Sequence, residues 1–179
     1  KERPSPPPSS PPQVEYCDDG SQYWRNEKRE LHNADDLPAY ISGDGKTRKW
    51  YQNGKLHRDG DLPAVVWDTG TEQWYQHGKL HRSNNDLPAE IRANGDRSWF
   101  ARGEFHREGD MPAFVGATGT LAWFHNGEVY RLNDQPAIIW CNGRKDWFRC
   151  STRHRDNDLP AVTRENGSAE WWWFGVRHR

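Results

Sequence analysis

Hydrophobic residues recur along this chain at a long and nearly fixed interval, not at the short period of a helix. The clearest markers are tryptophans 24 to 26 residues apart: Trp24, Trp50, Trp74, Trp99, Trp123, Trp147 and Trp171. An internal period of this length predicts a repeat architecture. No stretch follows the 3.6-residue period of an amphipathic helix beyond a few residues, and glycine, proline and asparagine interrupt the chain throughout, so we expect β structure.

The first half of each unit predicts a β-hairpin. In the unit that begins at Trp50, Asn53–Gly54 is a strong signal for a two-residue turn, because a type I′ turn needs positive φ at both central residues. Such a turn places Tyr51 opposite Leu56 and Trp50 opposite His57. Side chains alternate between the faces of a strand, so Trp and His should share one face and form cross-strand pairs along the array.

The second half of each unit carries a His-Arg pair, an Asp-x-Pro-Ala element and a β-branched residue two positions after the alanine. The six elements begin at Asp36, Asp61, Asp86, Asp110, Asp134 and Asp158. Proline cannot donate to a β ladder, so it marks a loop or a strand entry. We expect the arginine to pair with the aspartate across this loop, as Arg58 with Asp61, for about 0–1 kcal/mol if the pair is exposed.

Together these patterns predict an all-β fold, an elongated single-layer antiparallel meander of stacked β-hairpin repeats of about 24 residues. Residues 1–13 form a Pro/Ser-rich extended tail, and residues 14–179 form the array. The array opens at residue 14 and closes at residue 179 within half-units. Half-units of this kind are expected to act as caps or as edges that pair with partners.

The repeats resemble those of the MORN family. The resemblance is carried by WYQNGKLH at Trp50–His57, WYQHGKLH at Trp74–His81 and WFHNGEVY at Trp123–Tyr130. This chain has arginine after the histidine, as at Arg58, where the family usually has glycine, and its Asp-Leu-Pro-Ala element is closer to variant repeats of bacterial, phage and large DNA virus proteins. The resemblance implies a single-layer antiparallel sheet and a role as scaffold, protein-interaction platform or membrane-associated module, and it transfers no catalytic residue.

Composition and charge narrow the class of protein. The mean hydropathy of −1.18 would favour disorder, but eleven tryptophans supply a large aromatic area to bury. The net charge of −1 predicts no general attraction to nucleic acid. Three cysteines are too few for a disulfide framework and favour an intracellular reducing compartment, whereas a virion is implied by the resemblance alone. No apolar run reaches the ~18 residues of a membrane span, so a membrane partner is not indicated.

The recurring His, Arg and Asp residues admit a metal or catalytic interpretation and a structural one. Equivalent histidines two strands apart would lie roughly 10 Å from each other, too far to bind one metal ion. A residue that is repeated in every unit is also expected to have a structural role that every unit requires. We therefore expect no catalytic residue, no cofactor and no metal site.

Candidate partner-binding residues lie off the repeat pattern. In the tail, Pro4 and Pro7 follow Lys1 in a basic-x-x-P-x-x-P pattern, and Pro8 and Pro11 form a second P-x-x-P, which indicates either a docking peptide or a disordered tail. In the array the candidates are the tryptophans outside the period: Trp67, Trp140, Trp172 and Trp173. Trp67 and Trp140 share a position that varies between units, which indicates an exposed face.

These observations favour a non-enzymatic structural or protein-interaction scaffold whose tail and array edges dock onto other proteins in a larger assembly. A minor structural protein of a large DNA virus particle is one such role. The alternative is a module that binds carbohydrate or phosphoinositide head groups through exposed aromatics and the arginine stripe.

Overall fold

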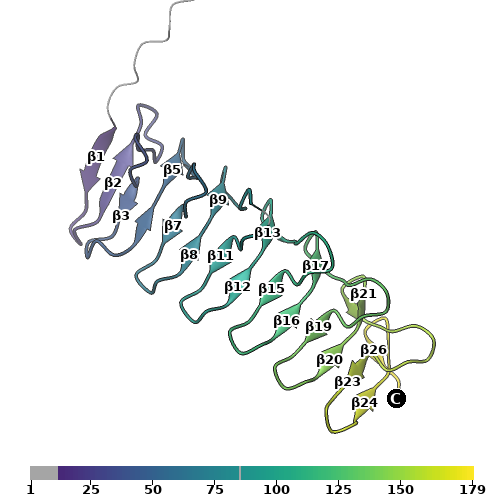
Figure 1. The fold of residues 1–179 in the computed structure, drawn as a ribbon. Coiled ribbons are helices and arrows are strands. Elements are labelled where there is room, and N and C mark those ends of the chain that lie inside the picture. Colours follow the sequence, from purple (N-terminus) through teal and green to yellow (C-terminus); the bar gives the residue numbers. More distant parts are fainter. Residues whose placement is uncertain (1–11, 85) are drawn as a thin grey trace, which may run out of the picture.

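The computed structural model describes residues 12–84 and 86–179, which form an elongated all-β array without helices (Figure 1). Short antiparallel strands are arranged in two rows: one continuous sheet of 14 strands, and a series of two-stranded hairpins along one long side of that sheet. The predicted single-layer meander of hairpin repeats is therefore confirmed. Each unit, however, contributes two ribbons, one to the sheet and one to the hairpin row.

The sheet strands follow the order of the chain. They are β1 (Gln13–Tyr16), β2 (Gln22–Arg25), β3 (Tyr40–Ile41), β4 (Arg48–Lys49), β7 (Val65–Val66), β8 (Glu72–Gln73), β11 (Glu90–Ile91), β12 (Arg97–Ser98), β15 (Phe114–Val115), β16 (Leu121–Ala122), β19 (Ile138–Ile139), β20 (Lys145–Asp146), β23 (Val162–Thr163) and β24 (Ala169–Glu170).

The hairpins are formed by the segment after each tryptophan. They pair β5 (Tyr51–Gln52) with β6 (Lys55–Leu56), β9 (Tyr75–Gln76) with β10 (Lys79–Leu80), β13 (Phe100–Ala101) with β14 (Glu104–Phe105), β17 (Phe124–His125) with β18 (Glu128–Val129), β21 (Phe148–Arg149) with β22 (Thr152–Arg153), and β25 (Trp172–Trp173) with β26 (Val176–Arg177).

The hairpin turns have the predicted geometry. Asn53 and Gly54 both adopt positive φ, 48° and 75°, as a type I′ turn requires. Tyr51 pairs with Leu56, and Gln52 with Lys55, so the predicted register is confirmed. The amide of Gly54 also donates to the carbonyl of Leu31 in the preceding unit (2.9 Å), so the turn holds successive hairpins together as well as closing its own.

Each tryptophan sits at the corner between the sheet and its hairpin. The amide of Trp50 donates to the carbonyl of Ala64, and the carbonyl of Trp50 accepts from the amide of His57. The interior tryptophans are 6–8% exposed and the Asp-x-Pro-Ala alanines 0–1%, so the two together form the core, as predicted for the periodic tryptophans. Alanine recurs here because the loop backbone comes back to the indole at a distance that leaves no room for a larger side chain.

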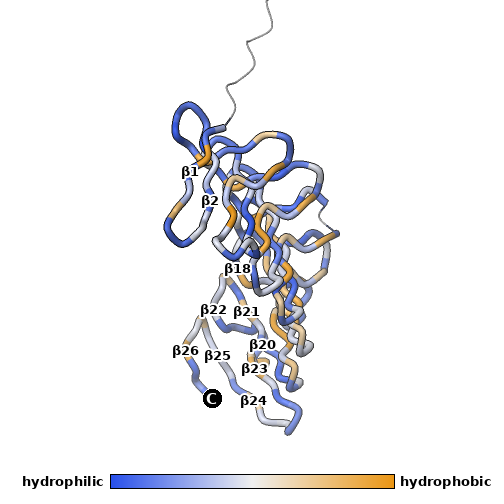
Figure 2. The backbone as a smooth tube through the Cα atoms, turned by 90° about the vertical axis from the view of Figure 1, so that its left-hand side faces the viewer, coloured by the Kyte–Doolittle hydropathy of each residue, from blue (hydrophilic) through white to orange (hydrophobic). Residues whose placement is uncertain are grey.

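The sheet has an inner and an outer face, because successive side chains of a strand point to opposite sides. The inner face carries the buried members Val65, Glu90, Ser98, Asp146 and Val162 and faces the hairpins. Figure 2 shows the array from the β1 end, with β25 and β26 set apart from β23 and β24. The outer face carries Gln22, Ile41, Arg48, Val66, Glu72, Ile91, Arg97, Val115, Leu121, Ile139, Lys145 and Thr163 in one row of directly paired positions.

Enlarging one core alanine should destabilise the array. Ala113 is fully buried, and Ala113→Leu forces extra methylene groups against closely packed backbone, so we expect a loss of about 1–3 kcal/mol in the free energy of unfolding. Ala93 lies in an exposed turn, so Ala93→Leu is the matched control and should change it by less than about 0.5 kcal/mol. Urea unfolding followed by tryptophan fluorescence measures both. Equal effects would show that the alanine position is not close-packed.

Candidate functional site

The most regular constellation of side chains joins each unit to the one before it. Arg58 stacks on its own Trp50, with the guanidinium carbon 3.8 Å from the ring centroid, and donates two hydrogen bonds to the carboxylate of Asp36 at 2.7 and 2.8 Å. The Trp50 indole donates to the backbone carbonyl of the same Asp36 (2.9 Å). Asp36 therefore binds the next unit through both its side chain and its main chain. We call this contact the Trp–Arg–Asp joint.

The joint recurs with nearly constant geometry. Arg82, Arg131, Arg155 and Arg179 each pair with the aspartate of the preceding unit and stand 3.7–4.2 Å over their own tryptophan. The Arg82, Arg131 and Arg155 side chains are only 11–16% exposed. A bidentate guanidinium–carboxylate pair fixes orientation as well as distance. The arginine stripe is thus engaged in the array itself.

The expected pairing of Arg58 with Asp61 is wrong, because Asp61 binds Arg82 of the following unit. The physical reason lies in the loop. Asp61 follows Gly60, and both residues have positive φ, 56° and 72°, so the chain reverses and the carboxylate points toward the next unit. The Arg58 guanidinium instead donates to the carbonyl of Pro63 in its own loop (3.2 Å) and reaches back to Asp36.

One joint departs from the pattern. Arg82 and Asp86 are separated by one residue more than the corresponding pairs in the following units. Arg107 still lies 3.8 Å over Trp99, but its Nε atom is buried without a hydrogen-bond partner, and Asp86 forms no ion pair with it. Burial lowers the pKa of the Arg107 guanidinium. The insertion therefore leaves this joint without its hydrogen-bonded ion pair, and the charge of Asp86 acts on Arg107 only at longer range.

A second repeated contact connects neighbouring hairpins through histidine. His57 Nδ1 accepts a hydrogen bond from the amide of His77 in the next hairpin (3.2 Å), and its Nε2 lies 3.1 Å from the carboxylate of Asp59. These partners assign the proton to Nε2, which donates to the carboxylate. His106 and His154 make the same pair of contacts, and the hydrogen bond from His106 lowers the pKa of Glu108.

The predicted cross-strand pairing of tryptophan with histidine is found in the backbone, but the two rings pack on other partners. His57 does lie opposite Trp50 along the backbone, but its ring packs against His77, with the centroids 4.6 Å apart, while Arg58 covers the Trp50 ring. The chain bends at the tryptophan, so strand alternation does not continue from the sheet into the hairpin. His77, in the hairpin turn, and His125, at the end of β17 beside the next hairpin turn but one, are both exposed.

The off-period tryptophans do not form one surface. Trp67 and Trp140 are 36% and 37% exposed, as expected for candidate contact residues, and lie at equivalent positions three units apart, which corresponds to roughly 29 Å. The Trp67 indole donates to Gln73, and Lys49 Nζ lies 4.5 Å over its ring. Trp172 is half-buried, whereas Trp173 is 56% exposed. Pro4, Pro7, Pro8 and Pro11 lie outside the described residues.

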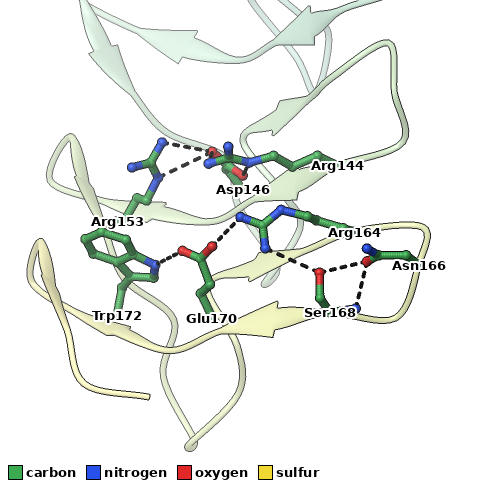
Figure 3. A network of polar contacts seen from close by, with 8 residues as sticks. All are labelled: Arg144, Asp146, Arg153, Arg164, Asn166, Ser168, Glu170 and Trp172. Atoms are coloured by element: carbon green, nitrogen blue, oxygen red, sulfur yellow. Dashed lines mark hydrogen bonds and ion pairs between the residues drawn. The ribbon is translucent and has the colours of Figure 1, made fainter.

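A polar network links sheet and hairpins in the last two units (Figure 3). Asp146 is fully buried and binds Arg144 at 2.6 and 2.8 Å and Arg153 at 3.3 Å. Glu170 binds Arg164 and the Trp172 indole, and the Arg164 hydrogen bond lowers its pKa. Both oxygens of Asp146 are thus bound by guanidinium groups, which makes it a structural carboxylate.

Shallow grooves recur between the hairpins and the His-Arg loops. The groove between loops 32–37 and 57–62 has a volume of about 550 Å³, and the groove between segments 130–135 and 154–157 about 250 Å³. Equivalent positions of the unit line both, so the groove is a property of the repeat. The groups of His, Cys, Asp and Glu in residues 12–84 and 86–179 include none arranged to hold a metal ion. In the same residues no helix could cross a membrane, and all three cysteines are exposed thiols.

No protein-family model matches this chain, and no curated protein is similar to it at a significant level.

The irregular joint provides a matched test of the regular one. Asp110→Asn removes the carboxylate that binds Arg131 and should lower the free energy of unfolding by up to about 1 kcal/mol, the upper range for exposed pairs. Asp86→Asn changes the same position where Arg107 has no ion pair, so we expect a change of less than about 0.3 kcal/mol. Urea midpoints compare the two variants. A larger effect for Asp86→Asn would contradict the assignment.

Acid should weaken the joints. Hydrogen bonds from arginine lower the pKa of Asp36, Asp61 and Asp110, so their contribution to stability is complete above the unfolded value of about 3.9 and is lost as pH falls through the folded values. The triple variant Asp36→Asn, Asp61→Asn and Asp110→Asn should therefore show a shallower decline in urea midpoint below about pH 4 than the parent. Parallel curves for the two proteins would contradict this role.

Proposed function

We propose that this protein is a non-enzymatic structural or protein-interaction scaffold that acts within a larger assembly. One observation carries the proposal: most of the recurring polar side chains that could have served binding or catalysis are engaged in contacts between units, with Arg107 and His81 as exceptions. Arg58, His57 and Asp36 represent these sets, and each contacts a neighbouring unit. These contacts support an extended rod.

The surfaces left for partners are distributed along the rod. The solvent-facing candidates are Trp67 and Trp140 on the rim of the sheet and Trp173 on the last described hairpin. Separated aromatic contacts of this kind suit a protein partner that spans several units, since exposed tryptophans are frequent anchors in protein interfaces. A large DNA virus particle is one assembly in which such a rod would serve, and this suggestion rests on the resemblance of the repeats.

The alternative of a carbohydrate or phosphoinositide module has less support. It depends on the arginine stripe, whose guanidinium groups already contact tryptophan and aspartate, and on aromatics that lie too far apart to hold one small head group. A glycan and phosphoinositide array probed with the full chain distinguishes the proposals. Specific binding that Trp67→Ala or Trp140→Ala abolishes would favour the ligand module over the scaffold.

Removal of the tail tests docking directly. We expect a chain of residues 14–179 to associate with the native assembly at least about tenfold less than the full chain, because the proline-rich segment offers a short docking peptide. Quantitative mass spectrometry of purified native assemblies measures the ratio of the two tagged chains. The chain with Pro4, Pro7, Pro8 and Pro11 changed to alanine keeps the length and serves as the matched variant. Equal incorporation of all three chains would remove the docking role.

A further inference from the structure

The outer face of the sheet carries charged side chains that the array leaves unpaired. Arg48, Glu72, Arg97 and Lys145 make no hydrogen bond or ion pair within residues 12–84 and 86–179, and they alternate with half-buried aliphatic residues. On the inner face, by contrast, Glu90 and Asp146 each bind an arginine. The charges of the outer face are therefore available to a partner that lies flat against it.

Outer-face residues that lie equal numbers of strands to either side of Ile91 complement each other in charge or in apolar character near the centre of the sheet. One strand away on either side stand Glu72 and Arg97, which have opposite charges. Two strands away stand Val66 and Val115. The next pairs outward are Arg48 with Leu121, Ile41 with Ile139, and Gln22 with Lys145.

We propose that the outer faces of two copies of this chain pack against each other in a two-fold symmetric dimer, with the axis parallel to strand β11 at Ile91. Across this axis, each residue of one copy faces the residue of the other copy that lies the same number of strands from Ile91 in the opposite direction along the chain. Glu72 of one copy then faces Arg97 of the other, and the same pair forms a second time by symmetry. Apolar residues meet at the centre and at every second strand, and no two like charges are opposed.

Other arrangements of the same two faces are less favourable. A two-fold axis along the length of the array would place Arg48, Glu72, Arg97 and Lys145 each opposite its own copy. Like charges that face each other across a buried interface are strongly unfavourable. Only a reversal about a strand axis brings Glu72 to an arginine, and the axis at Ile91 also matches Val66 with Val115. Axes at Val66 and at Val115 would also place Glu72 opposite a cation, Arg48 or Lys145, but the axis at Ile91 lies nearest the middle of the 14-stranded sheet and therefore overlaps the most strands. Charge complementarity thus indicates a second copy as the occupant, and the extent of overlap favours the register at Ile91.

The available area is sufficient for a stable contact. From β1 to β23 the face is roughly 60 Å long at about 4.8 Å between strands, and a strip about 12 Å wide covers on the order of 700 Å². A standard interface buries about 800 Å² on each partner. Sheets that pack face to face lie about 10 Å apart, a distance that the Glu72 and Arg97 side chains can span together. This inference concerns the outer face alone and does not depend on the scaffold proposal.

Charge exchange tests the register. Sedimentation equilibrium of the full chain at low salt gives the dimer dissociation constant, which we expect Arg97→Glu and Glu72→Arg each to raise at least about tenfold. The double variant E72R/R97E restores the opposite charges and should return the constant to within about threefold of the parent. Lys145→Glu changes net charge as Arg97→Glu does but faces Gln22, so it is the matched control with a change below about threefold.

A second measurement covers variants that fold poorly. With Cys17, Cys141 and Cys150 changed to serine, Ile91→Cys lies on the axis and should be joined to its symmetry mate by a short bis-maleimide reagent. Ile139→Cys faces Ile41 and should not be joined to itself. Three results would overturn the proposal: a monomer at all concentrations, equal effects of Arg97→Glu and Lys145→Glu, or equal cross-linking at the two cysteine positions.

Discussion

The structure depends on one contact, the arginine held between the tryptophan of its own unit and the aspartate of the unit before. A single-layer sheet of two-residue strands buries little aliphatic surface, so backbone pairing alone would leave it weak. The Trp50 indole, the Arg58 guanidinium and the Asp36 loop form a stack in which the flat apolar faces cover each other and the polar edges are all bonded. The cation–π contact holds the guanidinium on the tryptophan of its own unit, and the charge-assisted hydrogen bonds bind it to the neighbouring unit. Stability therefore accumulates unit by unit, as in other linear repeats.

This constraint explains how a very polar chain folds. Aspartate and tryptophan supply the stabilising contacts that leucine and valine supply in a thicker domain, and the buried alanine packs with the indole. The histidine contacts add a second line of joints along the hairpins, and polar side chains such as Thr71 and Asp96 add a third by accepting amides of the next sheet turn. Three parallel lines of contact resist bending in different directions. A rod held in this way can present separated sites at fixed distances, which supports its proposed use as a scaffold.

The sequence predicts the local geometry better than the contacts between units. The Asn53–Gly54 turn and the buried tryptophans follow from rules that act within a few residues, and they are confirmed. The partner of Arg58 could not be chosen in this way, because in a repeat an aspartate lies at similar spacing before and after each arginine. The bend at Trp50 and the positive φ of Asp61 decide it, and both arise from packing. The contacts of Thr71 and Asp96 with the next unit were missed because the position changes residue type, with threonine in three units (Thr47, Thr71 and Thr120) and aspartate in another.

Asp146 shows the same limit for sites that occur once. Its signal in the sequence is an aspartate where other units carry tyrosine, lysine, glutamine, serine, alanine or glutamate before the tryptophan, and that variability resembles an exposed position. The structure instead buries it under Arg144 and Arg153, so a varied position proves to be an internal ion network. A position that varies between repeats is therefore exposed at Trp67, but at Asp146 it is buried in an ion network.

Hydrogen exchange of the tryptophan indoles, followed by NMR, tests the joint most directly. We expect strong protection for the indole N–H groups of Trp50, Trp74 and Trp147, which donate at 2.9–3.0 Å to the preceding unit, and weaker protection for Trp99, whose bond is 3.4 Å long beside the incomplete joint. Exchange of all four at the rate of a free indole would contradict the claim that these contacts hold the units together.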